Sequence, residues 1–207
     1  FKEINNLDAT PSFFVTITKI GFDLLINKSD IEMISLPEKT YTSLDKSAPL
    51  INATQVWVKG YSGKGITVCV IDSGINYTHP ALGGCFGSGC KVKGGYDYVN
   101  GDNNPIDDYD HGTHVAGIVA SQDSTYKGIA PNASLIAIKT QDQNGSGNLE
   151  DLINGIRWCR LNASIYNISI ITISINYGSV PYQGTCNDDV IAEINLANAS
   201  GIFVDVS

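Results

Sequence analysis

Four short runs of apolar, often β-branched residues stand out along the chain. The first, Ile66 to Ile71, follows a glycine-rich stretch and contains no charged residue. Ser134 to Lys139, Ile168 to Ile175 and Ile202 to Val206 have the same character. A short continuous apolar run of this kind is typical of a strand buried on both faces of a sheet. We therefore predict four strands of a covered sheet.

The segments between these runs carry helical periodicity instead. Apolar residues recur at intervals of three and four after His111, over residues 149–156 and over residues 190–197. Alternation of strands with helices predicts a parallel sheet flanked by helices, which is the α/β class. In such sheets chemistry collects at the carboxyl ends of the strands, so the residues after each run are the first candidates for a site.

The N-terminal part follows a separate pattern. Phe13 to Ile17 is predicted to be a strand, Thr18 to Ile26 a helix capped by Thr18, and Ile31 to Leu36 a second strand. These elements would form a small β-α-β unit. Residues Thr42 to Ala53 have little periodicity and are rich in Ser, Asp, Lys and Pro, so they are predicted to be a linker.

Composition narrows the classes of function. The 207 residues carry a formal net charge of −8, the opposite sign from a protein that binds nucleic acid through its overall field. No window approaches the roughly 18 apolar residues of a membrane span. With 43% hydrophobic residues, the chain is expected to form a globular core without a membrane span in this segment.

The five cysteines indicate an oxidising compartment. Cys85 and Cys90 enclose a short glycine-rich loop and are candidates for a small disulfide, because no second nearby pair completes a zinc site. Cys69 lies in an apolar run and is expected to be a small buried hydrophobic residue. Cys159 and Cys186 are further disulfide candidates that either pair with each other or stay free.

Sequons support the same compartment. Eight Asn-X-Ser/Thr acceptors occur, where chance predicts about three. They begin at Asn27, Asn52, Asn76, Asn132, Asn144, Asn162, Asn167 and Asn198. This excess predicts an extracellular or cell-surface glycoprotein, and the alternative is a set of Asn- and Ser-rich loops without glycans.

Two residues, Asp72 and His111, are candidates for a catalytic role. Asp72 immediately follows the first apolar run, in Asp72-Ser73-Gly74, where a carboxylate can accept a hydrogen bond from an imidazole. His111 begins a predicted helix in the string His-Gly-Thr-His-Val-Ala-Gly, as expected of a general base whose tautomer a carboxylate fixes. The alternative for Asp72 is an ordinary helix cap or turn former.

A metal centre is the competing interpretation of the histidine segment. It would use His111 and His114 with Asp107, Asp108 and Asp110. No Glu stands between the two histidines, as the helix of a zinc protease requires, so no catalytic metal is predicted. No cofactor is required by this reading. A structural calcium ion on the loop of residues 103–110 stays open, against the alternative of a solvated acidic loop.

The two motifs together resemble a known family. Val70-Ile71-Asp72-Ser73-Gly74-Ile75 and Asp110-His111-Gly112-Thr113-His114-Val115-Ala116-Gly117 are similar to the paired Asp and His motifs of subtilisin-like serine proteases. The resemblance runs from about Gly60 to the last residue. It implies a serine endopeptidase with an Asp-His-Ser triad, in which Asp72 orients His111 and His111 takes a proton from a serine hydroxyl.

The resemblance also implies two substrate-binding segments. Gly145, Ser146 and Gly147 resemble the strand segment that pairs with the backbone of an extended polypeptide substrate. Ser174, Ile175 and Asn176 resemble the opposing edge and one wall of the pocket for the residue before the scissile bond. The family commonly has Ser-Leu-Gly-Gly there, whereas this chain has Ser-Ile-Asn-Tyr.

Residues 1–41 resemble the C-terminal half of an inhibitory propeptide, which would occupy the substrate cleft of its own enzyme. In that case the peptidase domain begins near Thr42 and residues 42–207 form its N-terminal part. The alternative is a small accessory β-α-β module.

The nucleophile is missing from the sequence. Members of the family carry it in Gly-Thr-Ser-Met-Ala, and the nearest string here is Gly184-Thr185-Cys186. We expect a chain cut before the oxyanion Asn and the catalytic Ser, and inactive by itself, because loss of the nucleophile costs on the order of a millionfold in rate. The alternatives are a catalytically inactive homologue that acts as a peptide-binding or inhibitory module, and an unrelated α/β protein.

Overall fold

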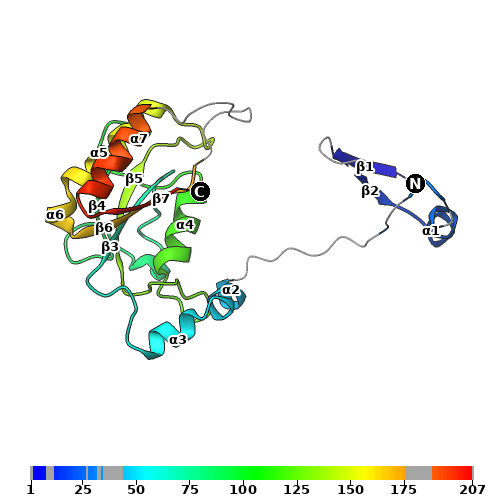
Figure 1. Ribbon diagram of the computed structural model, residues 1–207, viewed down its shortest axis with the longest axis horizontal. Coiled ribbons are helices and arrows are strands. Elements are labelled where there is room, and N and C mark those ends of the chain that lie inside the picture. The colour runs from blue at the N-terminus through cyan, green and yellow to red at the C-terminus, as the bar shows by residue number, and fades with distance from the viewer. Residues whose placement is uncertain are drawn as a thin grey trace. The chain divides into compact units, whose positions relative to one another are not determined.

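The structure is a computed structural model that describes residues 2–7, 12–26, 28–31, 34, 44–175 and 188–206. The chain divides into two compact units, Phe1–Thr42 and Ser43–Ser207 (Figure 1).

In the first unit, strand β1 (Lys2–Leu7) pairs antiparallel with β2 (Ser12–Thr16), and helix α1 (Lys19–Leu25) follows. The side chain of Thr18 caps α1 by accepting a hydrogen bond from the backbone N–H of Gly21. The sequence did not predict β1, whose Lys-Glu-Ile-Asn-Asn-Leu lacks an apolar run. The predicted strand Ile31–Leu36 lies mostly outside the described residues, and Ile31 and Ile34 are not in a strand.

The second unit begins with two short helices, α2 (Leu44–Leu50) and α3 (Ala53–Val58). The prediction of a linker over Thr42–Ala53 was therefore wrong for most of its length. The polar composition and Pro49 hid this helix from the sequence analysis, although its Ala48 is buried. Trp57 attaches α3 to the rest of this unit, because its indole N–H donates to the carbonyl of Ile129 at 2.9 Å.

The core of the second unit is a five-stranded sheet (Figure 1). Its strands are β3 (Thr67–Asp72), β4 (Val92–Asp97), β5 (Ser134–Lys139), β6 (Ile168–Ile173) and β7 (Phe203–Val206). Their order is β4-β5-β3-β6-β7, and every neighbouring pair is parallel. The predicted α/β class is confirmed. The sequence missed only β4 among these strands, because its Lys93-Gly94-Gly95 interrupts any apolar run.

Helices cover both faces of this sheet. They are α4 (His111–Ala120), α5 (Leu149–Leu161), α6 (Ala163–Tyr166) and α7 (Asp188–Ala199), with a 3-10 turn at Pro80–Leu82. Side chains of β3 alternate between two cores: Val68 and Val70 pack with the small residues of α4, whereas Cys69 and Ile71 pack beneath α5 and α7. Burial on both faces explains why the middle of β3, Val68 to Ile71, is apolar.

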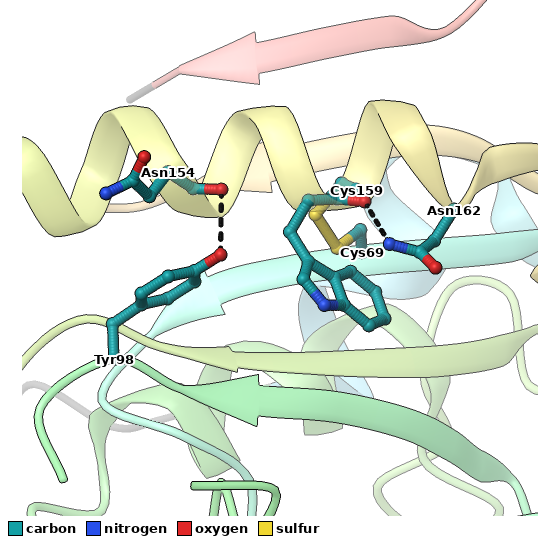
Figure 2. The surroundings of a disulfide bond; sticks show 6 residues. Cys69, Tyr98, Asn154, Cys159 and Asn162 are labelled. Atoms are coloured by element: carbon teal, nitrogen blue, oxygen red, sulfur yellow. Dashed lines mark hydrogen bonds between the residues drawn. A yellow bond between two sulfur atoms is a disulfide. The ribbon is translucent and has the colours of Figure 1, made fainter. Parts of the chain in front are cut away.

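A disulfide joins β3 to α5 across the second of these cores (Figure 2). Cys69 bonds to Cys159, although the sequence suggested a free thiol at Cys69 and offered Cys186 as the partner of Cys159. The correction follows from the fold, because both side chains point into the same fully buried core and their Cα atoms lie 6.3 Å apart. Cys186 lies outside the described residues.

Hydrogen bonds flank this disulfide on the same helix (Figure 2). The hydroxyl of Tyr98, just after β4, donates to the carbonyl of Asn154 at 3.1 Å. At the end of α5, the side-chain amide of Asn162 donates to the carbonyl of Trp158. The other candidate pair, Cys85 and Cys90, is also joined, five residues apart in sequence. Helix α5 is thus held to the sheet by covalent and polar links.

The strand order places β3 at the centre of the sheet, with β4 and β5 on one side and β6 and β7 on the other. The carboxyl end of the central strand of such a sheet is the usual position of a site, since loops from both halves meet there. None of the helices in the described part of the chain is long and apolar enough to cross a membrane.

Candidate active site

Asp72 and His111 meet at the carboxyl end of β3. Asp72 ends the strand and is fully buried, and His111 is the first residue of α4. Nδ1 of the imidazole lies 2.7 Å from Oδ1 of Asp72, and the side chain of His111 remains 42% exposed. The structure therefore brings together the two residues that the motifs singled out. Because the carboxylate holds Nδ1, Nε2 is the ring nitrogen that is left to act on a reacting group.

The carboxylate of Asp72 has a second hydrogen bond besides the one to the imidazole. Its Oδ1 also accepts the backbone N–H of Ser73 at 2.7 Å. Its Oδ2 is buried and has no hydrogen-bond partner among the described residues. A carboxylate so shielded from water interacts strongly with a charge beside it. A general base gains a positive charge when it accepts a proton, and on His111 that charge would lie directly beside this carboxylate.

The position of His111 depends on how the first turn of α4 is capped. The first N–H groups of a helix have no partner within the helix and need one from outside. The N–H of Gly112 donates to Oγ of Ser73 at 2.9 Å, and the N–H of Thr113 donates to Oδ2 of Asp107 at 2.7 Å. Ser73 in turn donates to Asp107 at 2.8 Å. The helix start is thus bound directly to the residue that follows Asp72.

Asp107 is the centre of this capping network. Besides Ser73 and Thr113, its carboxylate accepts the N–H groups of Tyr109 and Asp110, both at 3.0 Å. Partial burial by itself would raise the pKa of Asp107, but the hydrogen bonds from Thr113, Tyr109 and Ser73 outweigh it and hold that pKa below its ordinary value. Asp107 is therefore an ionised cap at neutral pH.

Two glycines allow the helix to approach the strand. A Cβ atom at Gly112 would lie 2.2 Å from the carbonyl oxygen of Gly74 and 3.0 Å from Cβ of Asp72. Gly74 has φ +105°, and a Cβ there would meet the carbonyl of Pro105 at 2.7 Å. Only glycine fits at these two contacts. The short distance between Asp72 and His111 follows from this close approach.

The predicted substrate-binding segment Gly145–Ser146–Gly147 lies in the loop after β5. Gly147 pairs with Gln141 in an antiparallel bridge, and the N–H of Asp142 donates to the carbonyl of Ser146 at 2.8 Å. Gly145, at φ +72°, contacts the ring of Tyr109, two residues before His111, since a Cβ atom there would lie 2.5 Å from its Cζ. This loop is therefore adjacent to the segment that leads into His111.

The opposing predicted segment follows β6 on the other side of β3. Ser174 and Ile175 are partly buried residues that continue from Ile173, the partner of Ile71 in the parallel pairing. Asn176 lies outside the described residues. The sheet order thus places the two described segments on opposite sides of Asp72.

The acidic loop before His111 was the candidate for a metal ion. Asp107 accepts the hydrogen bonds described above, and Asp108 forms an ion pair with Lys139. Within the described ranges, no group of three or more His, Cys, Asp or Glu residues is arranged to hold a metal ion. Calcium binding at this loop stays a prediction.

Sequence reasoning missed the residues that hold the pair in place. Ser73 and Asp107 act through contacts between loops, which no local pattern reveals. Lys139 is fully buried at the end of β5, beside Asp72 in the strand register. A usable signal existed for Lys139, since a charged residue that ends an otherwise apolar strand is rarely buried without partners.

Fold and site together define an α/β protein with a carboxylate–histidine pair at the carboxyl edge of its sheet. Comparison with known proteins identifies the family. The model of the subtilase family matches residues 63–207, and this chain therefore belongs to the subtilase family. The predicted resemblance to subtilisin-like serine proteases is confirmed.

Individual relatives agree with this assignment. Serine protease AprX of Bacillus subtilis is 34% identical over 222 residues, which cover 100% of this chain and 46% of AprX. Subtilisin DY of Bacillus licheniformis is 41% identical over 159 residues, covering 75% of this chain and 51% of that protein. The chain thus spans about half of each of these two relatives.

A solved structure confirms the fold. The crystal structure of a cold adapted subtilisin-like serine proteinase superimposes with a TM-score of 0.55 at 30% sequence identity. The superposition covers 70% of this chain and 47% of that chain. The parallel sheet with its flanking helices is therefore a subtilisin-like fold.

Proposed function

We propose that this chain is part of a serine endopeptidase that hydrolyses peptide bonds through an Asp-His-Ser triad. The observation that carries the proposal is the contact of 2.7 Å between buried Asp72 and half-exposed His111. Membership of the subtilase family supports it, since relatives of this chain include a serine protease, AprX. Asp72 and His111 supply two of the three catalytic side chains.

Each group has one role in the reaction. Nε2 of His111 accepts the hydroxyl proton of the serine as its oxygen attacks the carbonyl carbon of the substrate. The same proton then passes to the leaving amine when the peptide bond breaks, and a second cycle with water releases the acyl group. Asp72 keeps the proton of Nδ1 in place and stabilises the imidazolium, without itself becoming protonated.

The serine is the part of the triad that this chain does not show. Residues 1–207 contain no Gly-Thr-Ser-Met-Ala segment. We propose that the nucleophile and the oxyanion Asn belong to sequence that follows Ser207 in the gene product. On this account the 207 residues alone do not hydrolyse peptides by the triad mechanism.

The substrate is an extended polypeptide. Gly145, Ser146 and Gly147 on one side of Asp72, and Ser174 with Ile175 and Asn176 on the other, are proposed to hold its backbone by strand-like hydrogen bonds. Ser146 and Gly147 are exposed, which suits pairing with an incoming chain. Pairing through backbone atoms tolerates many side chains, as an endopeptidase requires.

Residues 1–41 are proposed to be the C-terminal half of a propeptide that occupies the substrate site of its own enzyme. The match to AprX supports this extent, because it covers the whole chain, including the first unit. The mature enzyme would then begin near Thr42. The minor extracellular protease Vpr of Bacillus subtilis, 39% identical over 154 residues, supports secretion. The two disulfides also fit an oxidising compartment.

The proposal is tested with a fluorophosphonate probe on the full-length gene product. The probe phosphonylates a serine hydroxyl that a neighbouring base activates. We expect one labelled serine, located by peptide mapping downstream of His111, and loss of labelling in the Asp72→Asn and His111→Ala variants. A folded, secreted product that takes up no label would refute the proposal and favour an inactive, peptide-binding homologue.

A further inference from the structure

Lys139 ends strand β5 and is fully buried, with its side chain 1% exposed. An ammonium group has three N–H donors, and a buried one needs an acceptor for each. Nζ of Lys139 lies 2.8 Å from the carbonyl oxygen of Ser73, 2.5 Å from Oδ1 of Asp108 and 2.8 Å from the carbonyl oxygen of Gln141. All three donors are therefore satisfied within the protein.

The three acceptors come from three different segments of the site. Ser73 directly follows Asp72, and Asp108 lies three residues before His111. Gln141 begins the loop that carries Gly145–Gly147, and it pairs with Gly147 in the antiparallel bridge. One ammonium group is thus bonded to the segment of the carboxylate, the segment of the histidine and the base of the proposed substrate-binding loop.

A second lysine shows what a purely structural arrangement looks like. Nζ of Lys91 donates to the carbonyls of Pro131 and Ala133, at 2.7 and 2.9 Å. Both acceptors belong to one segment, just before β5 begins, at the opposite end of the sheet from Asp72. Lys91 therefore binds a single segment, whereas Lys139 connects three segments that carry separate parts of the site.

We infer that Lys139 is a positioning residue, which sets the Asp72–His111 pair relative to the substrate-binding loop through its bonds to Ser73, Asp108 and Gln141. The inference rests on the proposed function, because it concerns the same site. A displacement of about 1 Å between reacting groups and substrate costs on the order of a hundredfold in rate. Loss of the ammonium group releases all three segments at once.

The test compares Lys139→Met with Lys91→Met in the full-length protein. Both substitutions keep an unbranched side chain and remove an ammonium group with its hydrogen bonds. Active sites are counted with the fluorophosphonate probe, and kcat/KM per counted site is measured for two substrates. One is a peptide that extends several residues before the scissile bond, and the other is a short ester of a single acyl residue.

For Lys139→Met we expect kcat/KM per site to fall at least about tenfold on the peptide, and by a smaller factor on the ester. The larger fall on the peptide reflects the displaced loop of Gly145–Gly147. Lys91→Met should lower the melting temperature but leave kcat/KM per site, and the peptide-to-ester ratio, within about twofold of the parent.

Other outcomes are decisive as well. If Lys139→Met does not fold, Asp108→Asn replaces it, because this change keeps Lys139 and weakens only its ion pair with residue 108. A lower ratio of peptide kcat/KM to ester kcat/KM is again expected. An unchanged ratio per counted site, in either variant, would overturn the inference and leave Lys139 a structural residue. A parent protein that neither takes up the probe nor cleaves either substrate would refute the proposed function, and with it the role of Lys139.

Discussion

Gly112 determines how closely His111 can approach Asp72. A methyl group there would lie 2.2 Å from the carbonyl oxygen of Gly74, so Gly112→Ala must push the start of α4 away from β3. We expect at least about a hundredfold lower peptide hydrolysis by the full-length protein, together with a lower melting temperature.

Gly117 provides the matched control in the same helix. A Cβ atom at Gly117 meets nothing within 4 Å. Gly117→Ala should therefore keep full activity and raise stability by about 0.5–1 kcal/mol, because alanine favours helix more than glycine does. Equal activities of the two alanine variants would contradict the close approach of α4 to β3.

Asp107 makes the stability of the site dependent on pH. Its pKa is lower in the folded protein than in the unfolded chain, so its stabilising effect is complete above the unfolded value and is lost as the pH falls through the folded value. We expect Asp107→Asn to lower the free energy of unfolding by about 1.5–3 kcal/mol at pH 7, measured by urea unfolding.

The difference between the parent and Asp107→Asn should shrink progressively as the pH is lowered below about 4, because the parent then loses the same charge. Asp123→Asn is the control, since that carboxylate accepts the N–H groups of Thr125 and Tyr126 in a turn away from the Asp72–His111 pair. If the loss in free energy of unfolding caused by Asp107→Asn did not change with pH, Asp107 would not be an ionised cap.

At the residue scale, the sequence supports statements about residues that lie in local motifs. Asp72 and His111 each stand beside an apolar run or a helix start, and the structure brings them to 2.7 Å. Ser73, Asp107 and Lys139 could not be assigned in the same way. Their roles depend on which loops meet at the end of β3, and that follows from strand order rather than from neighbouring residues.

The disulfide between Cys69 and Cys159 is the strongest link between two elements, β3 and α5. It closes a loop of 90 residues, whereas Cys85 and Cys90 are five residues apart. Loop-closure entropy predicts a stabilisation of about 4–5 kcal/mol for the first and about 2 kcal/mol for the second. Replacing both cysteines of a pair by alanine, followed by urea unfolding, measures each contribution.

We expect the double replacement at Cys69 and Cys159 to cost clearly more than that at Cys85 and Cys90. Replacement of the buried pair by alanine also removes two sulfur atoms from the core beneath α5, which adds to the loss of stability. If both double replacements lowered the free energy of unfolding equally, the Cys69–Cys159 bond would contribute little through the closure of its long loop.

At the element scale, the success of the sequence prediction depended on burial. Strands β3, β5, β6 and β7 were predicted because their apolar residues stand in continuous runs, and the bounds agree within two residues. Strand β4 lies at the edge of the sheet, and its two glycines carry no signal of their own. It forms through pairing with β5, which a search for local periodicity cannot detect.

At the scale of the whole molecule, strand order converts separate motifs into one site. Because β5 and β6 both lie beside β3, the loop after β5 and the segment after β6 reach Asp72 from opposite sides. The α/β class followed from the alternation of elements, but the order β4-β5-β3-β6-β7 did not, since it requires the unpredicted strand β4. The pairing of Cys69 with Cys159 was missed because it depends on how α5 packs on β3, which no local pattern shows.

The central claim is that His111, held by Asp72, is the general base of a serine endopeptidase. Two histidines of helix α4 allow a direct test, because exposed His114 lies only three residues from His111. The decisive measurement is kcat/KM for peptide hydrolysis by the full-length protein and by its His111→Ala and His114→Ala variants. The account predicts a loss of at least about a thousandfold for His111→Ala and a change within about threefold for His114→Ala. Hydrolysis that survives His111→Ala at the rate of the parent would contradict it.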